Sequence, residues 1–225
     1  MPIERFYISQ KLEGELRLVG TELHHLHVVR GKVGNEVELV NGRGSLAKAR
    51  IVDLSRKEAT LEVLETNNFP VPNPRLNLAI PLMRPSKLEL VIEKCTELGA
   101  GRFYLYKAEY SEKKELSKHQ KERLNLIAIS AIKQCGRLDL PEIQDSHSLK
   151  ELMNLDFPIF LGEPTSHSKV SFPEKILFVT GPEKGFSNQE SKLLNSHGKH
   201  VTLSPYILRA ETAPIAASCF FSSHT

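Results

Sequence analysis

The chain has 225 residues, of which 40% are apolar and 25% charged, so it can form a sizeable core in one domain or two. No apolar run approaches the roughly 20 residues of a membrane span, and the N-terminus has no apolar signal segment. We therefore expect neither an embedded protein nor one exported by a standard signal. A net charge of +3 and a pI of about 8.7 permit a nucleic-acid partner but fall short of a strongly basic chain.

Residues 1 to about 70 predict a small β-barrel with one short helical piece near Glu22–Arg30. The dipeptide Asn41–Gly42 is a strong hairpin signal between two of the strands. The predicted strands are Glu15–Val19, Glu36–Val40, Ala47–Leu54 and Ala59–Leu64. Residues 67–74 then hold three prolines and three asparagines, a composition that resists both helix and sheet. We therefore predict two domains, residues 1–70 and residues 71–225.

The second part of the chain alternates strands and helices, which is typical of an α/β domain. The predicted strands are Leu76–Pro81, Phe103–Tyr106, Pro158–Leu161 and Ile176–Thr180. The predicted helices start near Ser86, Lys118, Ser187 and Thr212. Ser86 with Glu89, and Ser187 with Glu190, have the spacing of a capping box, in which a helix N-terminus is closed reciprocally.

The three cysteines, Cys95, Cys135 and Cys219, include no CxxC pair, and each lies in an apolar or helical pattern. We therefore predict small buried side chains and a reducing, cytoplasmic environment. His24 and His27 are three residues apart, but no acidic or cysteine partner lies near them in the sequence. Since a zinc site usually needs three or four ligands, we expect no metal.

Two loops near the C-terminus form the strongest functional signal. The first is Gly181–Ser187 and the second is Leu208–Ala213, and each lies between a strand and a probable helix. In open α/β sheets, ligands bind beyond the carboxyl ends of strands, where glycine allows close approach and helix N-termini offer free N–H groups. A Gly-Pro pair alone chiefly marks a turn. Because the layout occurs twice, we predict a ligand site.

The order and spacing of several short segments resemble the bacterial 16S rRNA uracil-N3 methyltransferases, a branch of the SPOUT class. The resemblance covers nearly the whole chain. Besides the two loops, its segments are Arg5–Tyr7, His24–Arg30, Val33–Gly44, Glu93–Gly99, Gln134–Arg137 and Pro141–Ile143. The residues that depart from the family pattern are Leu82, Lys133, Lys184 and Ala210.

This resemblance implies a PUA-like β-barrel followed by an α/β SPOUT domain that contains a deep trefoil knot. It also implies a homodimer, S-adenosylmethionine as cofactor, and methylation of N3 of a uridine in the decoding region of 16S rRNA on assembled small subunits. The cofactor contacts that it implies are Leu161, Gly162, Thr180, Gly181, Pro182, Glu183, Gly185, Leu203, Ile207, Leu208, Thr212 and Ala213.

Uridine N3–H is a weak acid, so the reaction requires control of charge and position. We expect Arg209 to stabilise the uracil anion and Glu211 to orient Arg209 or help to remove the proton. Alternatively, Glu211 only complements the N-terminus of the last helix. Candidate phosphate contacts, each of which alone could be a solvated surface charge, are Arg5, Arg30, Lys32, Arg43, Arg84, Lys87 and Arg137.

Two other functions remain open from the sequence. One is ribose 2′-O-methylation by an enzyme of the same class, against which the barrel and the second loop argue. The other is a non-catalytic RNA-binding protein in which Lys184 and Lys133 mark a site that has lost turnover.

Overall fold

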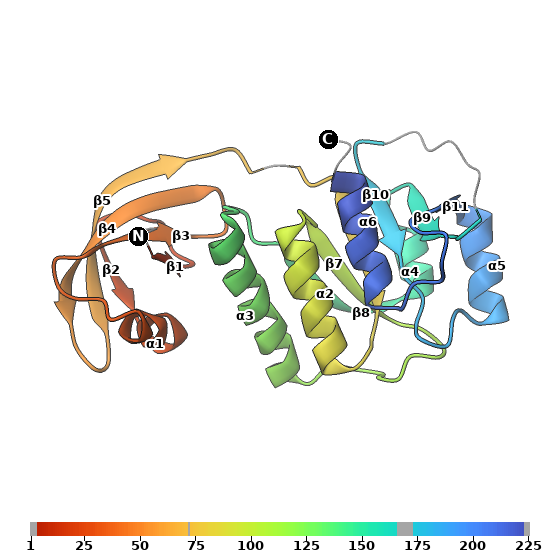
Figure 1. Cartoon of the computed structure of the whole chain (residues 1–225), viewed down its shortest axis with the longest axis horizontal. Coiled ribbons are helices and arrows are strands. Elements are labelled where there is room, and N and C mark those ends of the chain that lie inside the picture. The colour runs from red at the N-terminus through yellow and green to blue at the C-terminus, as the bar shows by residue number, and fades with distance from the viewer. Residues whose placement is uncertain (1–3, 72, 166–172, 223–225) are drawn as a thin grey trace. The chain divides into compact units, whose positions relative to one another are not determined.

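Two sheets organise the chain (Figure 1), which is described by a computed structural model over residues 4–71, 73–165 and 173–222. They belong to two compact units. Residues up to 71, together with Ile132–Leu140, form the first unit, and Asn73–Ala131 with the chain from Pro141 onward forms the second. The nine residues around the end of the long helix thus group with the N-terminal part of the chain, which the sequence did not indicate.

The first unit is built on a five-stranded sheet in the order β1-β3-β4-β5-β2. The strands are β1 (Arg5–Tyr7), β2 (Glu15–Leu18), β3 (Glu36–Val40), β4 (Ser45–Leu54) and β5 (Ala59–Asn68). Helix α1 (Gly20–Val28) buries Leu23 and Leu26 in the same core as Leu39 and Ile51. The pairs are antiparallel except β1 with β3.

The hairpin predicted at Asn41–Gly42 is confirmed between β3 and β4. The side-chain Oδ1 of Asn41 accepts hydrogen bonds from the backbone N–H of Arg43 (2.8 Å) and of Ser45 (3.1 Å). Gly42 has a φ of 69°, a conformation that glycine adopts without a Cβ penalty.

The second unit is built on a six-stranded sheet in the order β11-β9-β10-β6-β7-β8, and every pair in it is parallel. The strands are β6 (Leu76–Pro81), β7 (Arg102–Lys107), β8 (Glu142–Ser148), β9 (Ile159–Gly162), β10 (Ile176–Val179) and β11 (Gly198–Val201). All residues of β6 and β10 are buried. Parallel sheets are covered on both faces, which explains why these two strands are continuous apolar runs.

Helices cover this sheet. They are α2 (Pro85–Glu97), α3 (Lys118–Cys135), α4 (Leu149–Met153), α5 (Asn188–His197) and α6 (Thr212–Ser222). Helix α6 packs against α2 and β6, and the two helices lie side by side in Figure 1. Over the described ranges, no helix is both long enough and apolar enough to cross a bilayer.

One of the two predicted capping boxes is confirmed and the other is wrong. The Ser187 side chain accepts a hydrogen bond from the Glu190 N–H, and the Glu190 side chain accepts one from the Ser187 N–H. Helix α2, however, starts one residue before Ser86. Its N-cap is Arg84 and Pro85 occupies the first turn, where proline is pre-organised for a helix, so Ser86 is already helical.

The prediction of three buried cysteines is confirmed only for Cys95. Cys135 and Cys219 are exposed, because each lies on a helix position that faces away from the core. Burial raises the pKa of the Cys95 thiol to about 12, so this thiol is inert at neutral pH.

Candidate active site

The two C-terminal loops line one cavity of about 590 Å³, within the size range of ligand sites. The cavity opens beyond the carboxyl ends of the neighbouring parallel strands β9 and β10. Its lining includes every predicted cofactor residue except Thr212, the residue at which α6 begins. The residues that line it are Lys87, Leu161, Gly162, Glu163, Pro164, Phe178, Val179, Thr180, Gly181, Pro182, Glu183, Gly185, Phe186, Leu203, Ser204, Tyr206, Ile207, Leu208, Arg209, Ala210, Glu211 and Ala213.

The first loop is shaped by its two glycines. The N–H of Gly185 donates to the carbonyl of Pro182 (2.9 Å), and Gly185 has a φ of 77°, which disfavours other residues. At Gly181, a Cβ would lie 3.1 Å from the ring of Phe186, so the loop and this ring pack tightly. Lys184 is exposed and is not among the lining residues.

The second loop leads into α6 through Arg209, whose carbonyl accepts hydrogen bonds from the N–H groups of Thr212 (2.9 Å) and Ala213 (3.0 Å). Just before this loop, Tyr206 is 78% exposed and Ile207 is 91% exposed. Both line the cavity, so large apolar surfaces stand at its mouth.

Thr180 contributes a buried polar group to the cavity wall. Its backbone carbonyl accepts a hydrogen bond from the hydroxyl of Tyr106 (2.6 Å), and burial raises the pKa of Tyr106 well above its usual range. The Thr180 hydroxyl itself has no hydrogen-bond partner among the described residues, although the residue is only 4% exposed. Because an unpaired buried hydroxyl is costly, this group is suited to a ligand.

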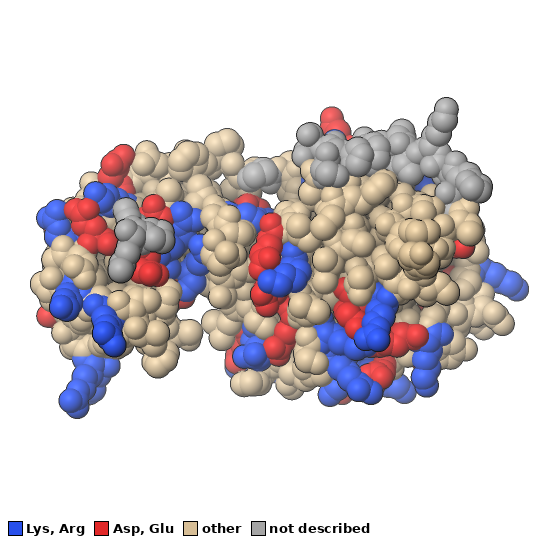
Figure 2. Space-filling model, in the orientation of Figure 1, with Lys and Arg blue, Asp and Glu red and all other residues tan. Residues whose placement is uncertain are grey.

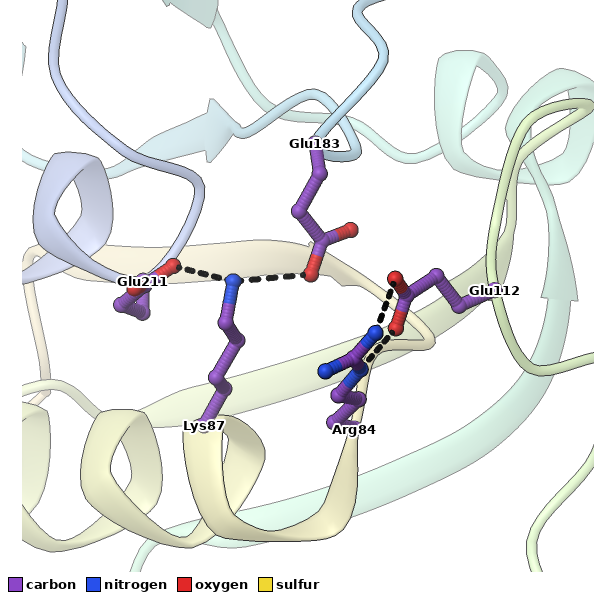
Figure 3. Close-up of polar contacts among 5 residues, drawn as sticks. All are labelled: Arg84, Lys87, Glu112, Glu183 and Glu211. Carbon is purple, nitrogen blue, oxygen red and sulfur yellow. Dashed lines mark hydrogen bonds and ion pairs between the residues drawn. The ribbon is translucent and has the colours of Figure 1, made fainter.

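A lysine joins the two loops (Figure 3). The Nζ of Lys87, in the first turn of α2, lies 3.2 Å from a carboxylate oxygen of Glu183 and 3.1 Å from one of Glu211. The side chains are 29%, 21% and 13% exposed in that order. The ion pairs with Glu211 and Glu183 raise the pKa of Lys87, so its ammonium stays protonated at neutral pH.

Glu211 is ionised under the same conditions. Burial pushes the pKa of Glu211 upward, but its own backbone N–H, Lys87 and Arg209 together outweigh burial and bring the pKa below its ordinary value. Arg209 lines the cavity and is exposed, and over the described part of the chain its guanidinium makes no hydrogen bond or close ion pair. The cavity therefore holds a fixed carboxylate beside an uncommitted cation.

The seven predicted RNA contacts do not form one group. Arg5 is paired with Glu38 (2.6 Å). In the same way Arg84 is paired with Glu112 (2.7 Å), and Arg137 with Asp139 (2.5 Å). Lys87 lines the cavity, while Arg30, Lys32 and Arg43 are exposed, as is the paired Arg84. On the face drawn in Figure 2, basic and acidic side chains are interspersed in both units. The role of all seven in RNA binding stays a prediction.

Several lining residues were not predicted. Phe178 belongs to an apolar strand, and nothing in its local sequence marks it as a ligand contact. Phe186 lies within the first predicted loop but was not itself predicted as a contact. Lys87 was predicted only as a phosphate contact. Its place in the cavity could have been predicted, because it follows β6, whose carboxyl end lies at the same sheet edge as that of its parallel neighbour β10. No group of three metal-ligating side chains occurs within the described ranges.

The chain is similar in sequence and structure to known proteins. Residues 71–222 match the RNA methyltransferase domain, and residues 18–64 match the RNA methyltransferase PUA domain. Ribosomal RNA small subunit methyltransferase E of Bacillus subtilis is 31% identical over 99% of this chain and 97% of its own length. The protein of that name from Synechocystis is 32% identical over 93% of this chain and 73% of its own length.

Solved structures agree with this fold. A methyltransferase from Legionella pneumophila in complex with the bound cofactor SAM is 25% identical, with a TM-score of 0.89 over 100% of this chain and 98% of that one. Ribosomal RNA small subunit methyltransferase E from Neisseria gonorrhoeae shares the fold, with a TM-score of 0.85 at 24% identity over 99% and 98% of the chains.

Fold and site together define an RNA methyltransferase with an α/β domain and a PUA domain. Within this class, the chain belongs to the ribosomal RNA small subunit methyltransferase E family. The resemblance found in the sequence is thus confirmed at the level of the family.

Proposed function

We propose that this chain is an S-adenosylmethionine-dependent methyltransferase that modifies N3 of a uridine in the decoding region of 16S rRNA, on assembled small subunits. The observation that carries the proposal is the meeting of Arg209 and Glu211, from one loop, with the glycine loop of β10 around a single cavity. Family membership supports the substrate class, and the similar Legionella structure supports the cofactor.

The residues around the cavity fit this cofactor. Apolar side chains such as Leu161, Phe178 and Leu203 suit an adenine ring, and the unpaired hydroxyl of Thr180 offers a polar contact. Glycines at 162, 181 and 185 let backbone groups approach a ligand closely. When bound, the cofactor supplies an electrophilic methyl group on a positively charged sulfur.

The chain's own residues then control the uridine. N3 is buried in Watson–Crick pairing, so the target base must be unpaired or flipped to reach the cavity. N3 loses its proton to solvent, which leaves negative charge on the uracil. That charge is consumed as N3 forms a bond to the methyl carbon and the bond from this carbon to sulfur breaks, so that the sulfur leaves as a neutral thioether. The free guanidinium of Arg209 is placed to stabilise that charge. Glu211 has a lowered pKa and is therefore a weak base, which favours a role in charge control over one in proton removal.

Of the four residues that depart from the family pattern, Ala210 lines the cavity, between Arg209 and Glu211, whereas the other three do not line it. Lys184 is outside the cavity lining, and Lys133 in the first unit pairs with Glu22 at 2.7 Å. The reading as a non-catalytic RNA-binding protein depended on these two lysines. Neither lysine lines the cavity, which favours the catalytic proposal over this alternative.

The remaining parts of the proposal follow from the family resemblance. We propose a homodimer, a trefoil knot formed by the C-terminal segment, and a functional division at about residue 70 into a PUA-like RNA-binding domain (residues 1–70) and a methyltransferase domain (residues 71–225). We place the enzyme in the cytoplasm, where ribosomal subunits are found.

A nucleoside analysis tests the proposal. Purified protein is incubated with methyl-labelled S-adenosylmethionine and small subunits that lack their native methylations, and the digested rRNA is examined by mass spectrometry. We expect labelled 3-methyluridine. Labelled 2′-O-methylribose would instead support the other activity of this class. If no label appears on a substrate that a positive control methylates, the catalytic proposal is wrong.

A further inference from the structure

Lys87 is the one residue of α2 in the cavity lining, and it is bound by both loops. Glu183 approaches its ammonium from the loop after β10, and Glu211 approaches it from the loop before α6 (Figure 3). Both carboxylates contact one nitrogen, so they face each other across it. Without that cation, two negative charges would lie close together at a partly buried site, which disfavours the arrangement.

Lys87 also decides which partner Glu211 has. Arg209 is only two residues away, and its positive charge helps to lower the pKa of Glu211. Nevertheless, Glu211 forms its ion pair with Lys87. An arginine fork binds a carboxylate strongly in a bidentate pair, so Arg209 is the natural competitor for Glu211. A guanidinium bound in that way could not also face an anionic substrate.

We propose that Lys87 is a positioning residue for the methyl transfer: its ammonium holds Glu183 and Glu211 and so keeps Glu211 away from Arg209, which leaves the guanidinium free for the uracil. This inference rests on the proposed function and gives Lys87 a role different from the phosphate contact predicted from the sequence. Lys87 does not have to touch the substrate in this role.

The charges of the site support this arrangement. The groups that face Glu211 are Lys87 from α2, Arg209 from its own loop and, through Lys87, Glu183 from the first loop. The pKa of Lys87 is raised and that of Glu211 is lowered, so both stay charged through the neutral range. The ion pair is therefore a constant part of the site at neutral pH.

The test compares Lys87→Met with Lys94→Met. Lys94 is a matched control because it lies on the same helix and also contacts two carboxylates, Glu93 (2.7 Å) and Glu97 (2.9 Å), outside the cavity lining. Each folded variant, checked by circular dichroism, is assayed for kcat on small subunits and for S-adenosylmethionine affinity by calorimetry. We expect kcat of Lys87→Met to fall about 10- to 100-fold, by misplacement of a catalytic group, and more than the cofactor affinity falls. Lys94→Met should resemble the wild type.

Two further variants separate positioning from a merely structural role. Lys87→Arg retains a cation and should be faster than Lys87→Met. If Lys87 acts through Glu211, its replacement should have no further effect once the Glu211 carboxylate is absent. The kcat of the double variant Lys87→Met/Glu211→Gln should then be no lower than that of Glu211→Gln alone. Full additivity of the two losses would overturn the proposal.

A measurement that does not depend on turnover completes the test. Carbon-13 NMR titration of the Glu211 carboxyl should give a higher pKa in Lys87→Met than in the wild type, and an unchanged pKa in Lys94→Met. An unchanged pKa in Lys87→Met would overturn the proposal, as would an unchanged kcat with weaker RNA binding. A wild-type product other than 3-methyluridine would refute only the proposed function, because the kcat comparison could still be made on that product. A wild type that methylates nothing would overturn both.

Discussion

Arg209 and Glu211 are two residues apart, but they are held in different ways. The carboxylate is fixed by Lys87, whereas the guanidinium is exposed and unpaired over the described part of the chain. We expect Arg209→Ala to lower kcat about 10²- to 10³-fold, comparable to the loss of a single oxyanion donor. A matched control is Arg102→Ala, since Arg102 is a half-exposed arginine paired with Glu142 outside the cavity. Single-turnover rates with saturating cofactor provide the measurement.

Glu211→Gln provides a second test at the same site, in which kcat is measured as a function of pH. A carboxyl group with a lowered pKa is charged at and above its ordinary pKa and loses that charge only as the pH falls through its value in the folded protein. We therefore expect a lower kcat for Glu211→Gln, but the same shape of the kcat profile from about pH 6 to 8. A wild-type inflection near pH 6.5 that the variant lacks would show that Glu211 is a base with a raised pKa. If both Arg209→Ala and Glu211→Gln retain wild-type rates, the roles assigned to these residues are wrong.

At the scale of elements, the cap of α5 shapes the end of the first loop. Ser187→Ala removes the side chain that accepts the Glu190 N–H, and this should reduce the free energy of unfolding by about 1 kcal/mol. Ser86→Ala is the matched control, because Ser86 is inside α2 and the helix N-cap is Arg84. It should change stability by less than about 0.5 kcal/mol. Urea unfolding of both variants measures the difference, and equal losses would mean that the cap at Ser187 does not contribute.

The elements that could be predicted from the sequence are those with a strong local pattern. Strand β6 was predicted with the same bounds as in the structure, since an unbroken apolar run fits a strand buried on both faces. Strands β8 and β11 were not given bounds, because Glu142–Ser148 and Gly198–Val201 are polar or half-exposed at most positions. Their strand conformation comes from the pairing with neighbouring strands.

The same distinction applies to the candidate site. The first loop could be placed from glycines, a proline and a capping box, which are local signals, and the second from its position between a strand and a probable helix. The meeting of Lys87 with Glu183 joins residues that are 96 positions apart and depends on the order of strands in the sheet. No spacing in the sequence encodes that contact. Side-chain burial was also not encoded by the local pattern. Cys95 is buried and Cys219 is exposed, although both lie on helices.

At the scale of the whole molecule, variants can test the proposed division of RNA binding and catalysis between the two units. We expect the combined variant Arg30→Ala/Lys32→Ala/Arg43→Ala to weaken RNA binding and to reduce the dependence of log K on log salt by about 2, as three phosphate contacts are lost. Cofactor affinity should not change, since these residues lie in the first unit and the cavity in the second. Filter binding at several salt concentrations gives the slope.

The control for this variant is Arg56→Ala/Lys57→Ala, which removes two exposed basic side chains of the same unit that were not predicted to bind RNA. Its salt slope should stay close to that of the wild type. If both variants reduce the salt slope of RNA binding by the same amount for each charge removed, the three predicted residues have no special role. RNA binding would then be a non-specific attraction to the overall charge of the first unit.

The long separation between Lys87 and its two partners has a consequence for biosynthesis. Translation proceeds from the N-terminus, so α2 is made long before the loops that carry Glu183 and Glu211. Until the second loop emerges, the ammonium of Lys87 lacks one of its counter-charges and the cavity lacks a wall. A nascent chain can therefore complete its first unit once Leu140 has emerged, but it cannot hold a cofactor in this cavity until Ala213 has emerged as well.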